Sequence, residues 1–273
     1  MTATTIPART TMATPQSRRH FAVQDALTIT WRNLKGMTRN PQVLVFSTIQ
    51  PIIFVVLFTY VFGGAIKIPG VNNYIDYLMP GVFAQTVVFG SVQTGIALAE
   101  DLQKGLLERF QSLPMARSAV LAGRTMADFV RNIFVVLIMV AVGFIVGWRI
   151  HTSVFELICG LLVMLLFAHS LSWIFAIVGL NASNAEAAQA ISFPILAPLV
   201  FASTAFVAAD QMPAGLQWFA EHQPVSVAVD AVRSLTYGAP FDQPGKVVAS
   251  IIWSVAIVAI CAPLAVRIYR RKV

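Results

Sequence analysis

The residues best suited to specific chemistry lie in a polar stretch near the middle of the chain. Glu108 and Arg109 stand side by side there, and Pro114 ends the pattern. The apolar residues of the stretch recur at helical spacing: Leu102, Leu106, Phe110 and Leu113. This spacing predicts a short helix with one apolar face over residues 100–113. Because a helix of about three turns is unstable alone, this face must pack on the ends of neighbouring helices or on a separate protein.

The motifs of common catalytic and nucleotide sites are missing from the sequence. No G-x-x-x-x-G-K-[ST] phosphate loop, H-E-x-x-H or G-x-S-x-G occurs. Cys159 and Cys261 both lie inside apolar runs, which argues against a disulfide framework and against a zinc site. We therefore predict that this chain has no catalytic residue, no metal and no cofactor, and that it does not hydrolyse ATP.

Ionisable residues are scarce within the long apolar runs; His169 is the clearest, and Glu156 sits near the outer end of the same run. Ionisable groups in lipid are functional candidates because burying them there costs free energy. Since Ser170 and Ser172 flank His169, we expect an interhelical hydrogen bond rather than proton transfer. So few acids within the runs disfavour transport driven by protons alone.

The elements that must position these residues are membrane helices. Hydrophobic residues make up 57% of the 273 residues, charged residues 11%, and the mean hydropathy is +0.74. With so few charged residues, this chain could not cover the surface of a soluble domain of the same length. We predict an all-α integral membrane protein with six transmembrane helices. The six apolar runs are Val43–Phe62, Leu78–Ala99, Phe129–Trp148, Val154–Leu180, Ile191–Ala208 and Val247–Val266.

Charge predicts the orientation of these helices. Of the 19 Lys and Arg residues, 15 fall on the side that carries both termini and the 100–131 loop. By the positive-inside rule, both termini are cytoplasmic. The net charge of +7 then divides into +9 on the cytoplasmic side and −2 outside. The excess is an orientation signal, and we predict no nucleic-acid partner.

An amphipathic helix is predicted over residues 22–39. Trp31 lies on its apolar side with other large apolar residues, and Arg32, Lys35 and Arg39 lie on a basic stripe. This pattern is typical of a helix lying in the cytoplasmic membrane interface, with its cations near anionic headgroups. It either anchors the chain or acts as a lever that links the membrane domain to a cytosolic partner. Both interpretations stay open.

The segment of residues 209–246, before the last apolar run, predicts two short helices on the outer side. Pro213 opens the first, residues 222–224 (His-Gln-Pro) break it, the second begins at Val225, and Gly238 stops it. Asp230 and Arg233 are three residues apart and are expected to pair. We predict that these helices are re-entrant and dip into the outer leaflet.

Two stretches of the sequence resemble a known family. Residues 105–117 (GLLERFQSLPMAR) and 223–235 (QPVSVAVDAVRSL) are similar to motifs of ABC-2 type exporter permeases, in particular the daunorubicin-resistance (DrrB-like) branch. In that family, the first stretch belongs to a cytoplasmic coupling helix that docks on the ATPase subunit. By the resemblance, Glu108, Arg109, Phe110, Leu113 and Pro114 couple this chain to the ATPase. The second stretch, with Pro224, Asp230 and Arg233, forms the re-entrant external helices.

The resemblance also implies partners and a substrate. Two permeases, either two copies of this chain or one copy with a related permease, are expected to assemble with two ATPase subunits that bind ATP and Mg²⁺. The location is the bacterial inner membrane, and the substrate is an amphipathic drug or lipid, because we count no charged residue along the spans. The second and fifth spans face each other across the dimer in the family. Their polar and aromatic residues form a possible substrate route: Gln85, Phe89, Gln93, Phe201, Thr204 and Phe206.

Other interpretations of the sequence have less support. A stand-alone secondary transporter remains the main alternative, and an intramembrane enzyme or a structural protein is weaker because no catalytic pair can be assembled. Residues 1–20 are expected to be a disordered tail, with an organelle transit peptide as the alternative. The other predicted units are an interfacial helix over 21–41, a six-span domain over 42–266 and a basic terminus over 267–273.

Overall fold

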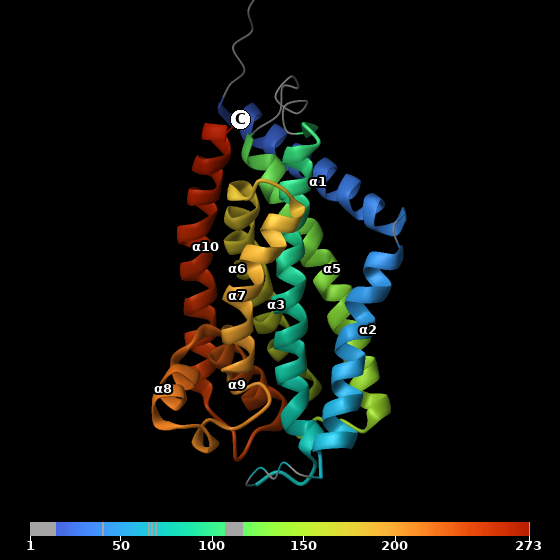
Figure 1. The fold of residues 1–273 in the computed structure, drawn as a ribbon, viewed down its shortest axis with the longest axis vertical. Helices are drawn as coiled ribbons and strands as arrows, with labels where there is room; N and C mark the ends of the chain where they lie inside the picture. The colour runs from blue at the N-terminus through green and yellow to red at the C-terminus, as the bar shows by residue number, and fades with distance from the viewer. Residues whose placement is uncertain are drawn as a thin grey trace, which may run out of the picture.

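The computed structural model describes residues 15–39, 41–64, 66, 68, 70–106 and 117–272, which form helices and loops without a strand. The helices stand side by side in one bundle, with α1 and the C-terminus at one end and α8 and α9 near the other (Figure 1). These two ends are called the α1 end and the α9 end below. The elements are α1 (Pro15–Arg39), α2 (Pro41–Leu57) with the π-helix η1 (Phe58–Phe62), α3 (Tyr74–Gln103), α5 (Arg117–Val146), α6 (Val154–Asn181), α7 (Ala185–Phe201), the short 3₁₀ helix η2 (Ala209–Gln211), α8 (Ala214–His222), α9 (Pro224–Tyr237) and α10 (Pro244–Lys272).

Four of the described helices are long and apolar enough to cross a membrane: α3, α5, α6 and α10. The other two apolar runs form shorter helices. α2 has 17 residues and continues into five residues of η1, and α7 has 17 residues. The multi-pass membrane character predicted from composition is therefore supported.

Helix α5 differs most from its predicted span. It begins at Arg117, whereas the apolar run was expected to start at Phe129. Its first turns mix polar residues such as Arg124 and Thr125 with Val120 and Leu121, so hydropathy alone assigned them to a loop. These turns pack on α1, and Arg124 and Arg131 each lie near Asp128.

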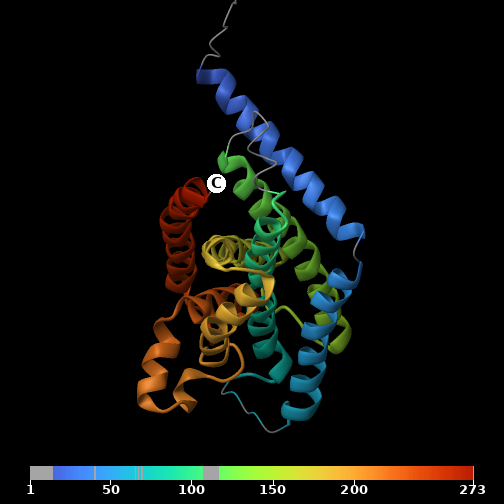
Figure 2. The same cartoon turned by 45° about the horizontal axis from the view of Figure 1, so that its top comes forward.

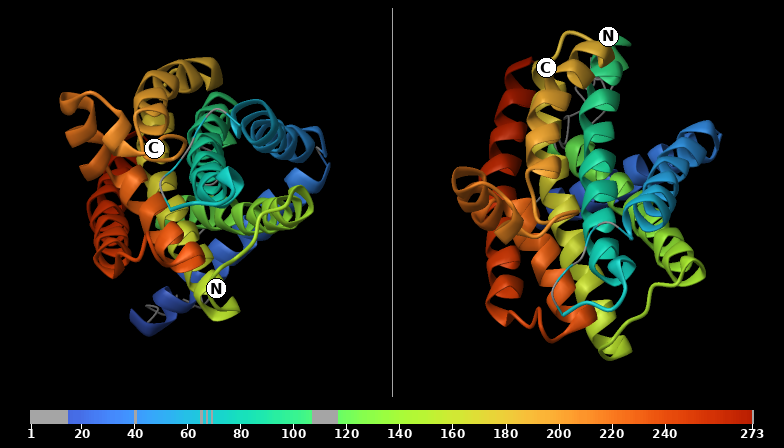
Figure 3. Two further views of the ribbon diagram at one scale, coloured as in Figure 1. Left: turned by 90° about the horizontal axis from the view of Figure 1, so that it is seen from below. Right: turned by 60° about the horizontal axis from the view of Figure 1, so that its bottom comes forward.

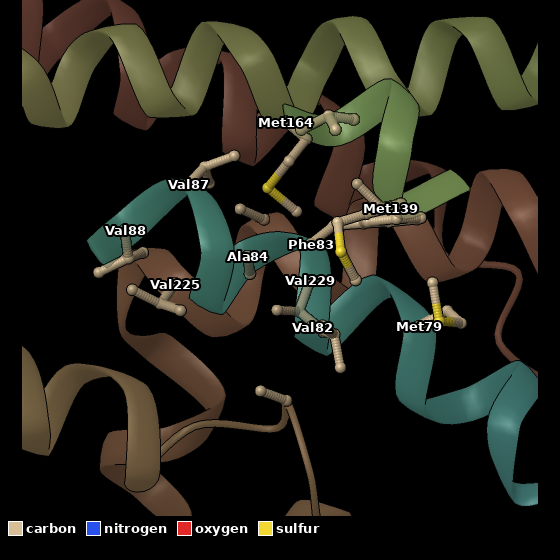
Figure 4. Packing of buried hydrophobic residues seen from close by; sticks show 14 of the residues in the cluster. Met79, Val82, Phe83, Ala84, Val87, Val88, Met139, Met164, Val225 and Val229 are labelled. Carbon is tan, nitrogen blue, oxygen red and sulfur yellow. The ribbon is translucent and has the colours of Figure 1, made fainter. Parts of the chain in front are cut away.

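Helix α3 is the centre of the bundle, and the core forms around it. Its buried residues pack against Met139 of α5, Met164 of α6 and Val229 of α9, as Figure 4 shows. Two glycines set the closest crossing. A Cβ added at Gly95 would lie 2.5 Å from the Phe175 carbonyl oxygen, and one at Gly179 would lie 2.1 Å from that of Gly95. Small residues allow this approach, as is typical of helices that associate in lipid.

The helices of the 209–246 segment begin and end where the sequence indicates. Pro213 caps α8, Pro224 is the first residue of α9, and Gly238 ends α9 at φ 73°. α9 is buried on almost every side, by α3, α6 and α10. It is therefore an internal helix at the α9 end, and the view from below in Figure 3 shows α8 further out.

Helix α1 crosses the bundle at a steep angle at the α1 end (Figure 2). It begins at Pro15, so residues 15–20, which were expected in a disordered tail, are helical. It packs on α5 through Ile29 and Thr30, whose hydroxyl donates to the Gly123 carbonyl at 3.1 Å. Its predicted apolar face is turned away from the bundle, and Trp31 is 69% exposed.

Candidate functional site

A cavity of about 590 Å³, called the inner cavity below, lies between α2, α3, α5 and α7 and is partly open to the surface. Helices α2 and α7 stand on opposite sides of α3 (Figures 1 and 3), so both walls of the cavity meet at this central helix. The lining mixes apolar side chains with amides and one cation. It consists of Gln50, Pro51, Gln85, Thr86, Phe89, Gly90, Val92, Gln93, Ile96, Arg131, Asn132, Val135, Gln189, Ser192, Phe193 and Leu196.

The α3 half of the predicted substrate route lines this cavity, and the half near α7 does not. Gln85, Phe89 and Gln93 all face it. Phe201 and Phe206 instead stack on each other with ring centroids 6.2 Å apart, and Phe206 also stacks on Phe58 at 4.8 Å. The α7 residues that do line the cavity lie nearer its beginning, within Gln189–Leu196. The fifth span was therefore assigned too far along the chain.

Two polar atoms in the cavity wall have no hydrogen-bond partner. They are Oε1 of Gln85 and Nδ2 of Asn132, and both side chains are buried. Asn132 was not identified from the sequence, because a single amide in an apolar run gives no periodic signal. Buried polar groups are nearly always hydrogen-bonded. One unpaired acceptor and one unpaired donor therefore mark this wall as a place where a polar ligand can bind.

A buried ion-pair cluster on α5 lies beside the cavity. Arg131 Nη1 is 3.5 Å from Asp128 Oδ1, and Arg124 Nε is 3.8 Å from Asp128 Oδ2. Thr94 of α3 donates to Asp128 Oδ2 at 2.6 Å, and Arg131 Nη2 donates to the Gly90 carbonyl at 2.5 Å. One carboxylate is thus shared by two guanidinium groups.

This cluster corrects the expectation that nothing charged lines the spans. Arg131 is 4% exposed and faces the cavity next to Phe89 and Val135. This placement was not predicted, because the sequence led us to count Arg131 with the cytoplasmic loop. The spacing of Arg124, Asp128 and Arg131 does give a usable signal, since residues three, four and seven apart lie on one side of a helix.

A second cavity of about 530 Å³ lies beneath α1, and Gln93, Ile96 and Arg131 line both cavities. Its remaining walls are strongly basic. The cations are Arg32, Lys35, Arg39, Lys104, Arg124 and Arg131, and the two carboxylates are Glu100 and Asp101. The predicted basic stripe of α1, with Arg32, Lys35 and Arg39, therefore lines an open cavity between α1 and the bundle, while Trp31 is exposed on another side of α1.

The residues predicted to contact an ATPase lie outside the described residues. Glu108, Arg109, Phe110, Leu113 and Pro114 all fall within 107–116. The segment that leads to them is described, and it corrects one boundary. α3 continues to Gln103, so Glu100–Gln103 belong to the spanning helix and do not begin a separate one. The helix ends where Gly105 adopts φ 64°.

At the α9 end, Asp230 and Arg233 form the predicted pair. Arg233 Nη1 donates to Asp230 Oδ1 at 2.8 Å, and its Nη2 donates to the carbonyls of Tyr77 and Thr204 at 3.2 and 3.0 Å. The guanidinium also lies 3.7 Å from the centre of the Tyr77 ring. Arg233 therefore fastens α9 to α3 and to the loop after α7. Pro224 starts the helix that carries it.

His169 packs at the interface of α6 and α5. Its Nε2 accepts a hydrogen bond from Trp173 Nε1 at 3.2 Å, one turn further along α6, and its ring meets Phe129 of α5 edge to face at 5.7 Å. The bond from Trp173 is thus within one helix, where an interhelical bond was expected. In the part of the chain that is described, no three His, Cys, Asp or Glu side chains gather as metal ligands.

Known proteins similar to this chain are membrane permeases. A family profile described as ABC-2 type transporter matches residues 24–237. The daunorubicin resistance ABC transporter permease protein DrrB1 of Streptomyces coeruleorubidus is 36% identical over 255 residues, which cover 93% of this chain and 89% of that protein. The probable doxorubicin resistance permease DrrC of Mycobacterium tuberculosis is 26% identical over 257 residues, 94% and 92% of the two chains. A putative transport permease of Cyanophora paradoxa is 24% identical over 218 residues, 79% and 75%.

Proposed function

This chain belongs to the ABC-2 type transporter family, and we propose that it works with separate ATPase subunits to export an amphipathic or lipid-like compound across a bacterial cell membrane. The resemblance predicted from residues 105–117 and 223–235 is confirmed by the family match. Its relatives are permeases of ABC transporters, two of them named for resistance to daunorubicin and doxorubicin. The chain is accordingly a permease, and we assign ATP and Mg²⁺ to the partner subunits.

The observation that carries the substrate class is the cavity between α2, α3, α5 and α7. Its volume of about 590 Å³ is within the range of roughly 300–1,000 Å³ that suits a drug-sized ligand. Apolar side chains such as Phe89, Val135 and Leu196 alternate in its wall with the amides of Gln85 and Gln93. A ligand with an apolar body and a few polar groups matches this lining.

We assign six spans with both termini in the cytoplasm. The chain direction alternates from α2 through α3, α5, α6 and α7 to α10 (Figure 1). The 17 residues of α7, and the 17 of α2 followed by five of η1, reach the minimum of about 17 residues for a transmembrane helix. The α1 end then faces the cytoplasm, which agrees with the 15 Lys and Arg residues on that side. The helices α8 and α9 then lie at the outer leaflet.

The proposed complex contains two permeases and two ATPase subunits. ATP binding favours one of two arrangements of the permease pair, and release of its products favours the other, which is alternating access. The residues that contact the ATPase are those of the coupling stretch, Glu108, Arg109, Phe110, Leu113 and Pro114. Helix α1 is the second contact, because it lies across the α1 end and packs on α5.

Reconstitution tests this function. The affinity-tagged chain is purified from its native membrane, and the ATPase that co-purifies is identified by its phosphate loop. The complex is placed in liposomes with a fluorescent amphiphile, and its ATP-dependent movement is measured with and without a protonophore. We expect transport that needs ATP and is insensitive to the protonophore. Transport without an ATPase that follows the proton gradient would instead establish the secondary transporter.

Variants of the coupling stretch locate the contact. Glu108→Ala, Arg109→Ala and Leu113→Asp should each reduce ATPase association and transport while the chain still inserts in the membrane. Glu186→Gln is the matched control, because Glu186 is an exposed acid at the start of α7 at the same end of the bundle. If all three variants keep both properties, the coupling role of this stretch is wrong.

A further inference from the structure

Cations outnumber carboxylates where the two cavities meet. Arg124 and Arg131 share the single carboxylate of Asp128, which is itself fully buried. The second cavity carries six cations against the lining carboxylates Glu100 and Asp101, and the exposed Lys104 pairs with Glu100. Arg124 and Arg131 are the largely buried cations of this set, and burying an excess charge costs free energy unless an opposite charge lies near it. The junction of the cavities is therefore suited to an anion.

The unpartnered atoms of the inner cavity match the same ligand. Asn132 accepts a hydrogen bond from Arg131 through Oδ1 at 3.4 Å, so its Nδ2 remains a free donor next to the guanidinium. Donors beside a cation suit the oxygens of a phosphate or a carboxylate. The free Oε1 of Gln85 accepts instead, and a hydroxyl on the same head group would satisfy it.

The rest of the inner cavity is built for an apolar chain. Phe89, Val135, Phe193 and Leu196 line it together with Pro51 of α2. This apolar wall begins at the buried cation Arg131. An amphipathic ligand can therefore place its charged head at Arg131 and its apolar tail along the wall. A free inorganic anion would use only the first part of this path.

We propose that the adjoining cavities bind an acidic lipid, with its anionic head on Arg131 and Asn132 and an acyl chain in the inner cavity. This inference deepens the proposed function, on which it rests, by naming the substrate class of the same site. The basic second cavity attracts the head group from the cytoplasmic side, because several like charges in a cleft raise the local concentration of counter-ions. A cationic amphiphile meets repulsion at the same place.

A binding titration on the full-length chain in neutral detergent tests the inference without ATP or an ATPase. The probes are short-chain phosphatidylglycerol, phosphatidylcholine of the same chain length, inorganic phosphate and dodecyltrimethylammonium. We expect saturable binding of phosphatidylglycerol and at least tenfold weaker binding of each of the others. If inorganic phosphate binds as tightly as phosphatidylglycerol, the acyl chain has no role in binding. Equal binding of phosphatidylcholine or of the cation would overturn the role of Arg131.

Three variants and one control separate the contributions of the head-group contacts and of the apolar part of the site. Arg131→Gln should weaken phosphatidylglycerol binding by about ten- to a hundredfold, the effect of losing one charge-assisted hydrogen bond. Asn132→Leu should weaken it several-fold and leaves the ion pairs intact. Val135→Trp fills the apolar part, so it should weaken binding of the lipid but not of phosphate. Arg270→Gln, which removes an exposed cation of the last turn of α10, should change nothing.

Asp128→Asn separates a binding role from a structural one. It removes the shared carboxylate, so both guanidiniums become available and phosphatidylglycerol should bind several-fold more tightly. A merely structural cluster predicts weaker binding together with a lower unfolding temperature. If this variant does not fold, Asn132→Leu and Val135→Trp still decide, and unchanged binding in both overturns the site. Because these titrations need no ATPase, their failure is distinguishable from failure of ATP-driven transport.

Discussion

Two Asp–Arg pairs of the same spacing, each with a buried arginine, lie in different parts of the bundle. Asp128 and Arg131 are on α5, and Asp230 and Arg233 are on α9. In each pair, a threonine from another segment donates to the aspartate carboxylate. A second cation also lies 3.8 Å from each carboxylate: Arg124 at Asp128 and Lys246 at Asp230. On composition alone, the two sites are equivalent.

Their surroundings make them different. The two terminal nitrogens of Arg233 hold three acceptors, and its guanidinium lies against Tyr77. The second cation there, Lys246, is 26% exposed and thus hydrated. At the other site, the ion pair of Arg131 is longer, at 3.5 Å against 2.8 Å, and Arg131 faces two cavities. Nε of Arg233 is without a partner, so the contrast lies in distance and position. The tighter pair holds helices together, whereas the looser pair beside the cavities is available to a ligand.

The largest effect is expected at the tighter pair, Asp230–Arg233. Arg233→Met leaves the carbonyls of Tyr77 and Thr204 without this donor and leaves Asp230 only the Thr204 hydroxyl and the more distant Lys246, which should lower the free energy of unfolding by about 3–5 kcal/mol. Unfolding by denaturant in detergent measures this loss. Arg149→Met, which removes an exposed arginine at the same end, is the control. A loss no larger than that of the control would contradict the fastening role of Arg233.

A smaller loss of stability is expected at the looser pair, Asp128–Arg131. After Arg131→Gln, Asp128 keeps Arg124 and the Thr94 hydroxyl as partners, and the glutamine can still reach polar groups. The free energy of unfolding should therefore fall by only about 2–3 kcal/mol, while transport by the reconstituted complex is lost. Arg131→Lys should restore part of the transport. If Arg131→Gln costs as much stability as Arg233→Met and transport survives, the two pairs have the same structural role.

The two threonines give a matched comparison of the carboxylates. Thr94 donates to Asp128 at 2.6 Å, and Thr204 donates to Asp230 at 2.9 Å. Replacement by the isosteric valine should cost about 1.5–2 kcal/mol at Thr94 and about 0.5–1 kcal/mol at Thr204. The reason is that Asp230 is 18% exposed and can bind water, whereas Asp128 is fully buried. Unfolding both variants under the same condition shows which valine substitution costs more stability. A larger loss at Thr204 than at Thr94 would show that water reaches Asp128.

The sequence predicted the elements that depend on local signals. Apolar runs located the membrane helices, and Pro213, Pro224 and Gly238 located the ends of α8 and α9. The Asp230–Arg233 pair was predicted because it stands in a polar segment where paired charges are conspicuous. Each of these signals lies within a few residues of the feature that it predicts.

The cavities could not be predicted in the same way. Their walls combine residues of four helices that are as far apart in the chain as Gln50 and Leu196. Asp128 lies just before the predicted span, and Arg131, within that span, was counted with the loop, because hydropathy cannot tell that these charges pair inside the bundle. The inner face of α1 was missed for a related reason. Ile29 and Thr30 bury against Gly123, a long-range contact that no periodicity reveals.

The smallest effect on stability is expected at an exposed ion pair, which serves as a reference for the two Asp–Arg pairs. Lys104 and Glu100 pair on the surface of the α3 terminus, and the hydrogen bond to Glu100 raises the pKa of Lys104. The folded chain therefore holds this proton more tightly than the unfolded chain. Its contribution is complete below the unfolded pKa of about 10.4 and is lost as the pH rises through the folded pKa. Lys104→Gln should thus lower the unfolding temperature slightly at neutral pH, and this difference should shrink at high pH and in high salt. Parallel melts of both chains across that pH range measure it, and a difference that grows with pH would contradict the pairing.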